Sequence, residues 1–331
     1  MIVKAFRQDK LAGSLLMAML TIVLALGSSS GNGIVDDQGA MPLFLLVRGT
    51  IALVPWFSTV VSASVVMLVA MQITWLANRS ELFERRNQLP ALLLPTLVAL
   101  NGSGFVVSAA LCGMPLVIWA FQRAWSVGSR EHALRSLFDA GLLLGAASMV
   151  YLPYAFLVVA IWASNAVLRP FSWREHLVPM VGLALVFHLC WGALLLVGLV
   201  EWDLRAALIR SPSERLRAVD VAQWPISWMV IALFAIPTWH HFSRSYSRSV
   251  MSEKNIRSAF LALTVALAVI GIGEALLTRQ PPMVLFAVPL SVLIGYPLLH
   301  ARRLLLAECG VWLLLGAAFW VQWGGLLYSP A

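Results

Sequence analysis

The chain has 331 residues, of which 60% are hydrophobic and 11% are charged, and its formal net charge is +8. A soluble domain of this length carries roughly 25% charged residues, so the composition excludes an ordinary soluble enzyme. Lysine and arginine collect in the cytoplasmic loops of membrane proteins, and the positive charge therefore does not require a nucleic-acid partner. The sequence predicts a polytopic membrane protein with one integral membrane domain, residues 1–331.

The first apolar stretch, residues 11–27, follows a decapeptide that contains three basic residues. The positive-inside rule therefore places the N-terminus in the cytoplasm. The same pattern is also typical of a cleavable signal peptide, but in a multipass protein we expect an uncleaved first helix. Residues 43–56 are short and interrupted, which favours an interfacial segment that leads into a helix at 57–77.

Two apolar regions, residues 89–121 and residues 137–168, are flanked by arginine at both ends. Both ends of each region should be cytoplasmic, so the chain must turn back inside each region. The turns are predicted at 101–104 and near 151–153, and each region then forms a hairpin of two short helices. Short helices persist in lipid only where protein or a watery cavity covers their ends.

After the second hairpin, the remaining apolar runs predict a full-length helix at 177–200 and four further helices. The expected ranges of these four are 224–240, 258–277, 283–299 and 304–327. Together with the earlier segments they give about eleven spans, with the C-terminus outside.

Asp36 and Asp37 lie in the first outside loop, which contains no basic residue. A carboxylate at the membrane surface can act as the general base for an acceptor hydroxyl, so we interpret the pair as candidate catalytic residues. The alternative is an exposed turn, which the neighbouring glycines favour.

The loop 201–221 is expected outside and yet is rich in arginine. The guanidinium fork matches phosphate oxygens, which predicts binding of a lipid phosphate at the outer surface. The alternative, which is compatible with the first, is an amphipathic surface helix whose leucines form an apolar side. The predicted phosphate-binding residues are Arg205, Arg210, Arg215, Arg217 and, from a later loop, Arg279.

Four ionisable residues, Arg48, Asp139, His188 and Glu274, lie within or near apolar runs. Such residues are costly in a membrane and are often functional, so Asp139, His188 and Glu274 together would suit the ion or proton route of a transporter. The alternatives are an acid at a helix start, a packed polar histidine and a surface pair for Glu274.

The glycines of the GLLLG stretch, residues 141–145, have the spacing that lets membrane helices pack closely. The three cysteines lie in apolar runs, and the pair His240 and His241 has no partner at metal-ligand spacing. The sequence therefore predicts neither a metal site nor a cofactor.

Residues 138–182, FDAGLLLGAASMVYLPYAFLVVAIWASNAVLRPFSWREHLVPMVG, carry the most specific motif of the chain. This stretch resembles the central signature of an uncharacterised integral-membrane family of Bacteroidota, which contains a similar R-P-F-x-W-R-E run. The segments NRSELFERRNQLPALLLPTL and LFAVPLSVLIGYPLL are similar to the same family. The resemblance implies a membrane protein, and it implies no activity.

The glycine-rich GLLLGAAS helix, the following proline-bearing helix and the arginine-rich turn are similar to the middle of C-superfamily glycosyltransferases. These enzymes use polyprenyl-phosphate sugars, and the resemblance implies a catalytic acid and an amphipathic segment near the first outside loop. The counterparts here are Asp36 or Asp37, the segment 43–56 and the arginines of 205–217. The first outside loop is shorter than in that superfamily.

The predicted fold is an all-α polytopic transmembrane helical bundle of about eleven helices, with two short paired-helix hairpins and a C-superfamily-glycosyltransferase-like core. The predicted function is glycosyltransferase-like handling of polyprenyl-phosphate-linked sugars at the outer face of the cell inner membrane. A membrane transporter or flippase, or a non-catalytic envelope assembly factor, is the alternative. Membrane lipid is the expected partner, and nucleic acid is not.

Overall fold

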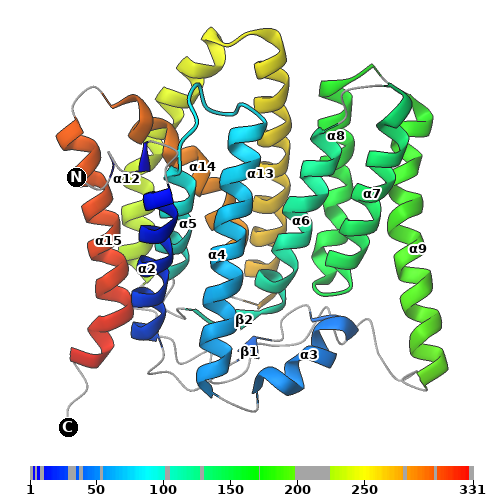
Figure 1. The fold of residues 1–331 in the computed structure, drawn as a ribbon, viewed down its shortest axis with the longest axis horizontal. Coiled ribbons are helices and arrows are strands. Elements are labelled where there is room, and N and C mark those ends of the chain that lie inside the picture. The colour runs from blue at the N-terminus through cyan, green and yellow to red at the C-terminus, as the bar shows by residue number, and fades with distance from the viewer. Residues whose placement is uncertain are drawn as a thin grey trace.

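The protein is a bundle of helices that stand side by side, with two short strands at one end (Figure 1). The structure is a computed structural model. It describes residues 3, 6–7, 11–28, 35–36, 40–52, 55–100, 105–126, 130–170, 172–197, 224–278, 282–301 and 304–327.

The elements follow one another in an order that matches the predicted sequence of apolar runs. In chain order they are α2 (Leu11–Ser28), β1 (Val35–Asp36), α3 (Pro42–Ala52), α4 (Pro55–Arg79), α5 (Leu89–Ala99), β2 (Val107–Ser108), α6 (Ala109–Trp125), α7 (Arg130–Ser148), the 3-10 helix η1 (Leu152–Leu157), α8 (Val158–Leu168), α9 (Trp173–Val197), α12 (Trp224–Arg248), α13 (Met251–Thr278), α14 (Val284–His300) and α15 (Leu304–Leu327).

Four helices of the described part, within α4, α9, α13 and α15, are long and apolar enough to cross a membrane. A span needs about 20 predominantly apolar residues, and α5, α8 and α14 are shorter. The all-α fold is therefore confirmed, and the four long helices support a membrane protein. The count of eleven spans stays a prediction.

Both expected hairpins are present, because α5 and α6 run in opposite directions, as do α7 and the η1–α8 segment (Figure 1). Tyr151 has an extended backbone and separates α7 from η1. Pro153 follows in the first turn of η1, where its missing N–H removes no hydrogen bond. The second hairpin turns where the sequence predicted, while the glycine-containing turn 101–104 lies outside the described residues.

The tips of both hairpins are covered by the segment that precedes α4. Strand β1 pairs in parallel with β2 at the tip of the first hairpin. Ala40 forms a bridge with Tyr151 at the second, and the Met41 N–H donates to the carbonyl of Val150 at 3.2 Å. These bonds satisfy backbone groups that a helix end leaves without partners. Protein therefore covers the short helices at these points.

The connection between α12 and α13 differs from the sequence prediction. The helices were predicted at 224–240 and 258–277, but α12 continues to Arg248 and α13 begins at Met251. Serine, arginine and lysine are tolerated in helices, and a helix that extends beyond an apolar core keeps its backbone hydrogen bonds. Hydropathy marks the apolar part of such a helix and not its end.

All but one of the lysine and arginine residues that the structure describes lie towards one end of the bundle, the upper edge in Figure 1. We call it the basic end, and the exception is Arg48 in α3, at the opposite end. The basic end also holds the described part of the N-terminus. There Arg7 donates to the carbonyls of Leu298 and Ala301, close to the C-terminus of α14, where a cation suits the helix dipole.

Helices α7 and α9 pack closely because glycines face each other between them. A Cβ atom at Gly141 would meet the backbone of Pro179, and one at Gly182 would lie 2.8 Å from the carbonyl oxygen of Phe138. Backbone atoms cannot move aside as a flexible side chain can. The close packing predicted from the glycine spacing is confirmed, with Gly182 as its partner on α9.

We expect Gly182→Ala to lower the free energy of unfolding by about 1–3 kcal/mol, because the added methyl group overpacks two helix backbones. Gly192→Ala is the matched control on α9, since a Cβ atom at Gly192 has nothing within 4 Å. The control should be neutral or slightly stabilising. Thermal unfolding in detergent, followed by circular dichroism, measures both, and equal midpoints for the two variants would contradict the packing argument.

Candidate functional site

Most of the predicted site residues lie outside the part of the chain that the structure describes. Of Asp36 it describes the backbone, in β1. The catalytic and phosphate-binding roles therefore stay predictions. The residues outside the described ranges are Asp37, Arg205, Arg210, Arg215, Arg217 and Arg279.

The other ionisable candidates are spread over the bundle. Asp139 in α7 is half-buried, His188 in α9 is exposed, and Glu274 in α13 is 7% exposed. None of the three lines either of the two cavities described below. These three side chains together in one cavity would favour the transporter interpretation, and neither of these two cavities provides that arrangement.

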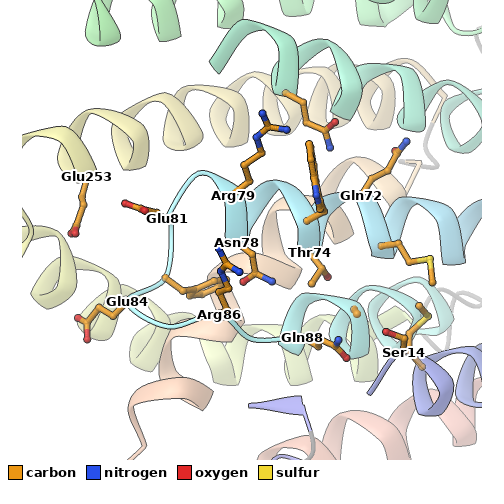
Figure 2. Close-up of a pocket in the computed structure, with 16 residues that line it drawn as sticks. Ser14, Gln72, Thr74, Asn78, Arg79, Glu81, Glu84, Arg86, Gln88 and Glu253 are labelled. Carbon is orange, nitrogen blue, oxygen red and sulfur yellow. The ribbon is translucent and has the colours of Figure 1, made fainter. Parts of the chain in front are cut away.

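A cavity of about 1150 Å³ opens at the basic end, beside the last turns of α4. We call it the α4 cavity. Helices α2, α4, α5, α6 and α13 and the segment between α4 and α5 contribute to its lining (Figure 2). Its lining residues are Ser14, Met17, Met71, Gln72, Thr74, Trp75, Asn78, Arg79, Glu81, Phe83, Glu84, Arg86, Gln88, Ala91, Gln122 and Glu253.

The polarity of the α4 cavity changes with depth. Arg79 ends α4, and Glu81 and Arg86 follow in the segment 80–88, so the charged groups gather at the basic end (Figure 2). Gln72 lies seven residues earlier on α4, which corresponds to roughly 10 Å along the helix. The deeper part of the cavity is thus lined by uncharged polar groups within a membrane-spanning helix. This gradient fits an amphipathic ligand with a polar head.

Gln72 is the polar side chain that most directly indicates a ligand. Its Oε1 atom is buried and has no hydrogen-bond partner among the described residues. A buried acceptor without a donor costs about 1–3 kcal/mol, and a ligand hydroxyl could supply the donor. Next to it on α4, Trp75 stacks under the guanidinium of Arg79, 4.7 Å from the ring centroid. An amide beside an aromatic ring suits a sugar in two ways. The amide forms hydrogen bonds with sugar hydroxyl groups, and the face of the aromatic ring packs against sugar C–H groups.

Asparagine side chains hold the segment that follows α4 against the helix. The Asn78 amide donates to the carbonyl of Asn87 at 2.9 Å and accepts from its N–H at 3.1 Å. The Asn87 side chain in turn accepts from the N–H of Leu89 at 3.1 Å, where α5 begins. These paired bonds fix the direction in which the chain leaves α4. The mouth of the α4 cavity is therefore built on a constrained segment.

Glu81 has a φ of 53°, the left-handed conformation that favours glycine. The N–H of Leu82 donates to the carbonyl of Ala77 at 3.1 Å, five residues back. That bond is typical of a Schellman helix end, in which glycine normally takes the left-handed position. A glutamate in this place is held in an unfavourable conformation at the mouth of a cavity, and such strain is common at functional sites.

We expect Glu81→Gly to raise the free energy of unfolding by about 1 kcal/mol, because glycine takes the left-handed conformation without strain. Glu84→Gly is the matched control, since it removes the same charge from the same segment at a position without left-handed backbone. The control should be destabilising. Thermal midpoints of the two purified variants test this, and a lower midpoint for Glu81→Gly would overturn the argument.

A second cavity, of about 640 Å³, lies between α12, α14 and α15 at the basic end. We call it the α12 cavity. His241 and His300 stack at its edge with ring centroids 6.0 Å apart, and the Nε2 atom of His300 lies 3.5 Å from Glu84 Oε1. Among the described residues, no group of three or more His, Cys, Asp or Glu side chains is placed to hold a metal ion.

His241 follows the predicted span 224–240. Partial burial lowers its pKa, as do the nearby positive charges of His300, His240 and Arg244. A histidine whose pKa lies below its usual value is largely uncharged at neutral pH. His241 therefore adds little positive charge to the α12 cavity at that pH, whereas Arg244 and Arg248 are charged.

Between the two cavities lies Arg257, a charged residue with only 1% exposure. It donates to the carbonyl of Ser245 at 2.7 Å and lies 3.5 Å from the Glu253 carboxylate. The charge of Arg257 also acts on the nearby Tyr296, whose hydroxyl donates to the carbonyl of Leu82 at 2.6 Å. This network joins α12, α13, α14 and the segment after α4. The walls of both cavities depend on it.

The α4 cavity was not predicted from the sequence, because only ionisable residues in apolar runs were taken as candidates and Gln72 is uncharged. The signal was present in the span itself. Gln72, Trp75 and Arg79 are separated by three and four residues, so they share one face of α4. Gln122, from α6, has no such pattern around it and is recognised only in the folded structure.

Comparisons with models of protein families, with curated proteins and with solved structures give no match. The two resemblances inferred from the sequence therefore stay predictions.

Proposed function

We propose that this protein handles lipid-linked sugars in the cell envelope and that the α4 cavity binds the sugar head group. The observation that carries the proposal is the unpartnered Gln72 amide oxygen beside Trp75, at the uncharged end of a cavity whose mouth is charged. The deep groups suit sugar hydroxyls. Arg79 and Arg86 at the mouth suit the phosphate of a polyprenyl-phosphate-linked sugar.

The surface of α4 supports entry from the bilayer. Two cavity-lining residues, Met71 and Trp75, are 50% and 47% exposed. In a membrane-spanning helix, exposed apolar surface faces lipid, so the cavity borders the hydrocarbon. A polyprenyl chain can remain in the bilayer while its head group enters the cavity.

In this proposal the protein lies in the cell inner membrane with its N-terminus and its basic end in the cytoplasm. The gathering of described arginines at that end supports this orientation through the positive-inside rule. The α4 cavity then opens on the cytoplasmic side. A head group that enters this cavity from the cytoplasmic side would have to be moved to the outer face. Translocation, as by a flippase, is therefore the function that the cavity supports best.

Glycosyl transfer at the outer face is the second candidate, and one observation favours it. The strand that contains Asp36 pairs with the tip of the first short hairpin, at the end of the bundle opposite the α4 cavity. If Asp36 is the catalytic acid, it would thus be carried by an anchored backbone. The arginines of the 201–221 loop and Arg279 would bind the lipid phosphate there.

The first test is binding of a short-chain analogue, farnesyl-phosphate-linked glucose, to the purified protein in detergent. We expect Gln72→Leu and Gln122→Leu each to weaken binding about tenfold, because each removes a desolvated hydrogen bond of about 1.4 kcal/mol. Trp75 lines the cavity, so tryptophan fluorescence reports the titration.

Ser64→Ala is the control, since Ser64 is an exposed α4 residue outside the cavity whose hydroxyl bonds only its own helix. It should bind as the unchanged protein does. Farnesyl phosphate without glucose should bind more weakly than the glucose conjugate. The proposal fails if the variants, the control and the unchanged protein bind the conjugate equally.

The second test separates transfer from translocation. If the protein is an outer-face glycosyltransferase, Asp37→Asn and Arg210→Ala should each abolish a glycan product while the protein still inserts in the membrane. Profiles of envelope glycans and the membrane content of the protein measure this. Unchanged glycans in both variants, combined with a loss in Gln72→Leu, would exclude glycosyl transfer and favour translocation.

A further inference from the structure

The α12 cavity has an apolar interior and a basic rim. Its interior is formed by residues of three helices, and Leu306 among them is 67% exposed, so the apolar wall continues onto the outer surface of α15. An acyl chain can therefore lie along the wall and continue into the bilayer. The apolar residues are Phe234, Pro237, Pro297, Leu298, Ala301, Leu306 and Ala307.

The rim carries an excess of positive charge. Arg244 and Arg248 are both exposed and lie four residues apart on α12, where two like charges repel each other. Glu84 is the one carboxylate among the described lining residues, and it pairs with His300. Two arginines thus line the cavity together with one carboxylate, and an anion between the arginines would relieve their repulsion.

Ser245 independently indicates that a ligand binds in the α12 cavity. Its side chain lines the cavity and the residue is 5% exposed, yet its hydroxyl has no hydrogen-bond partner among the described residues. The Ser245 carbonyl accepts a bond from buried Arg257 at 2.7 Å, which fixes the backbone at this position. A buried hydroxyl normally finds a partner, and here an acceptor from outside the chain would complete it.

We infer that the α12 cavity binds the phosphate group of an anionic membrane lipid, with Arg244, Arg248 and Ser245 as the donors and the acyl chain along the apolar wall. Arginine forks and a hydroxyl are the donors that suit phosphate oxygens. Basic pockets between membrane helices are suited to anionic head groups of the adjoining leaflet. This site is separate from the α4 cavity and does not depend on the lipid-linked sugar proposed there.

The test compares phosphatidylglycerol with phosphatidylcholine as the probe, added to the purified protein in detergent, with bound lipid counted by native mass spectrometry. The unchanged protein should bind phosphatidylglycerol at least tenfold more tightly than phosphatidylcholine. The double variant Arg244→Gln, Arg248→Gln should lose this preference, and Ser245→Ala should weaken phosphatidylglycerol binding several-fold.

The matched control is the double variant Arg123→Gln, Arg174→Gln, which removes two exposed arginines from the same end of the bundle and from neither cavity. It should keep the preference, and thermal unfolding should show that all variants fold. Equal losses in both double variants, or no preference in the unchanged protein, would overturn the inference. Competition by inorganic phosphate at the affinity of the lipid would also overturn it, because the site would then recognise a free anion.

Discussion

A bilayer offers no hydrogen bonds to a polypeptide backbone, and this constraint shapes the whole structure. Two hairpins of short helices turn towards the end of the bundle that carries β1 and β2, and their ends need partners from the protein. The segment from β1 to the start of α3 supplies them, through the β1–β2 pairing and through Met41 and Leu43, whose N–H groups donate to Val150 and Met149. The position of β1, which contains Asp36, thus follows from backbone hydrogen bonding before any catalytic role is considered.

The same constraint separates two kinds of buried polar side chain. Arg257, on α13, bonds the carbonyl of Ser245 on α12 and pairs with Glu253 on its own helix. Its charge also acts on Tyr296 of α14. Arg257, Gln72 and Ser245 each leave one buried atom without a partner in the described structure, Nε in the case of Arg257. Gln72 and Ser245 are placed differently because each lines a cavity, whereas Arg257 lines neither. A polar group that the protein itself does not satisfy has a cost, and that cost is removed when a ligand binds. The proposals for the two cavities rest on this difference.

The two cavities are neighbours. Glu84 lines both, and the segment that carries it is held by Asn78 on one side and by Tyr296 on the other. The strained residue of this segment, Glu81, lies at the mouth of the α4 cavity. A sugar head group in the α4 cavity and a lipid phosphate in the α12 cavity would thus contact the same short stretch of chain, between α4 and α5.

The sequence by itself determined the membrane class and the up-and-down order of the helices, since arginines at both ends of residues 89–121 and 137–168 permit only hairpins. It also indicated the close contact of α7, because glycine spacing is a local pattern. Only the tertiary structure decided where the cavities lie, since Gln72 and Gln122 belong to helices fifty residues apart in sequence and meet through packing. Hydropathy averages over a helix, whereas a binding site depends on which faces of several helices are brought together.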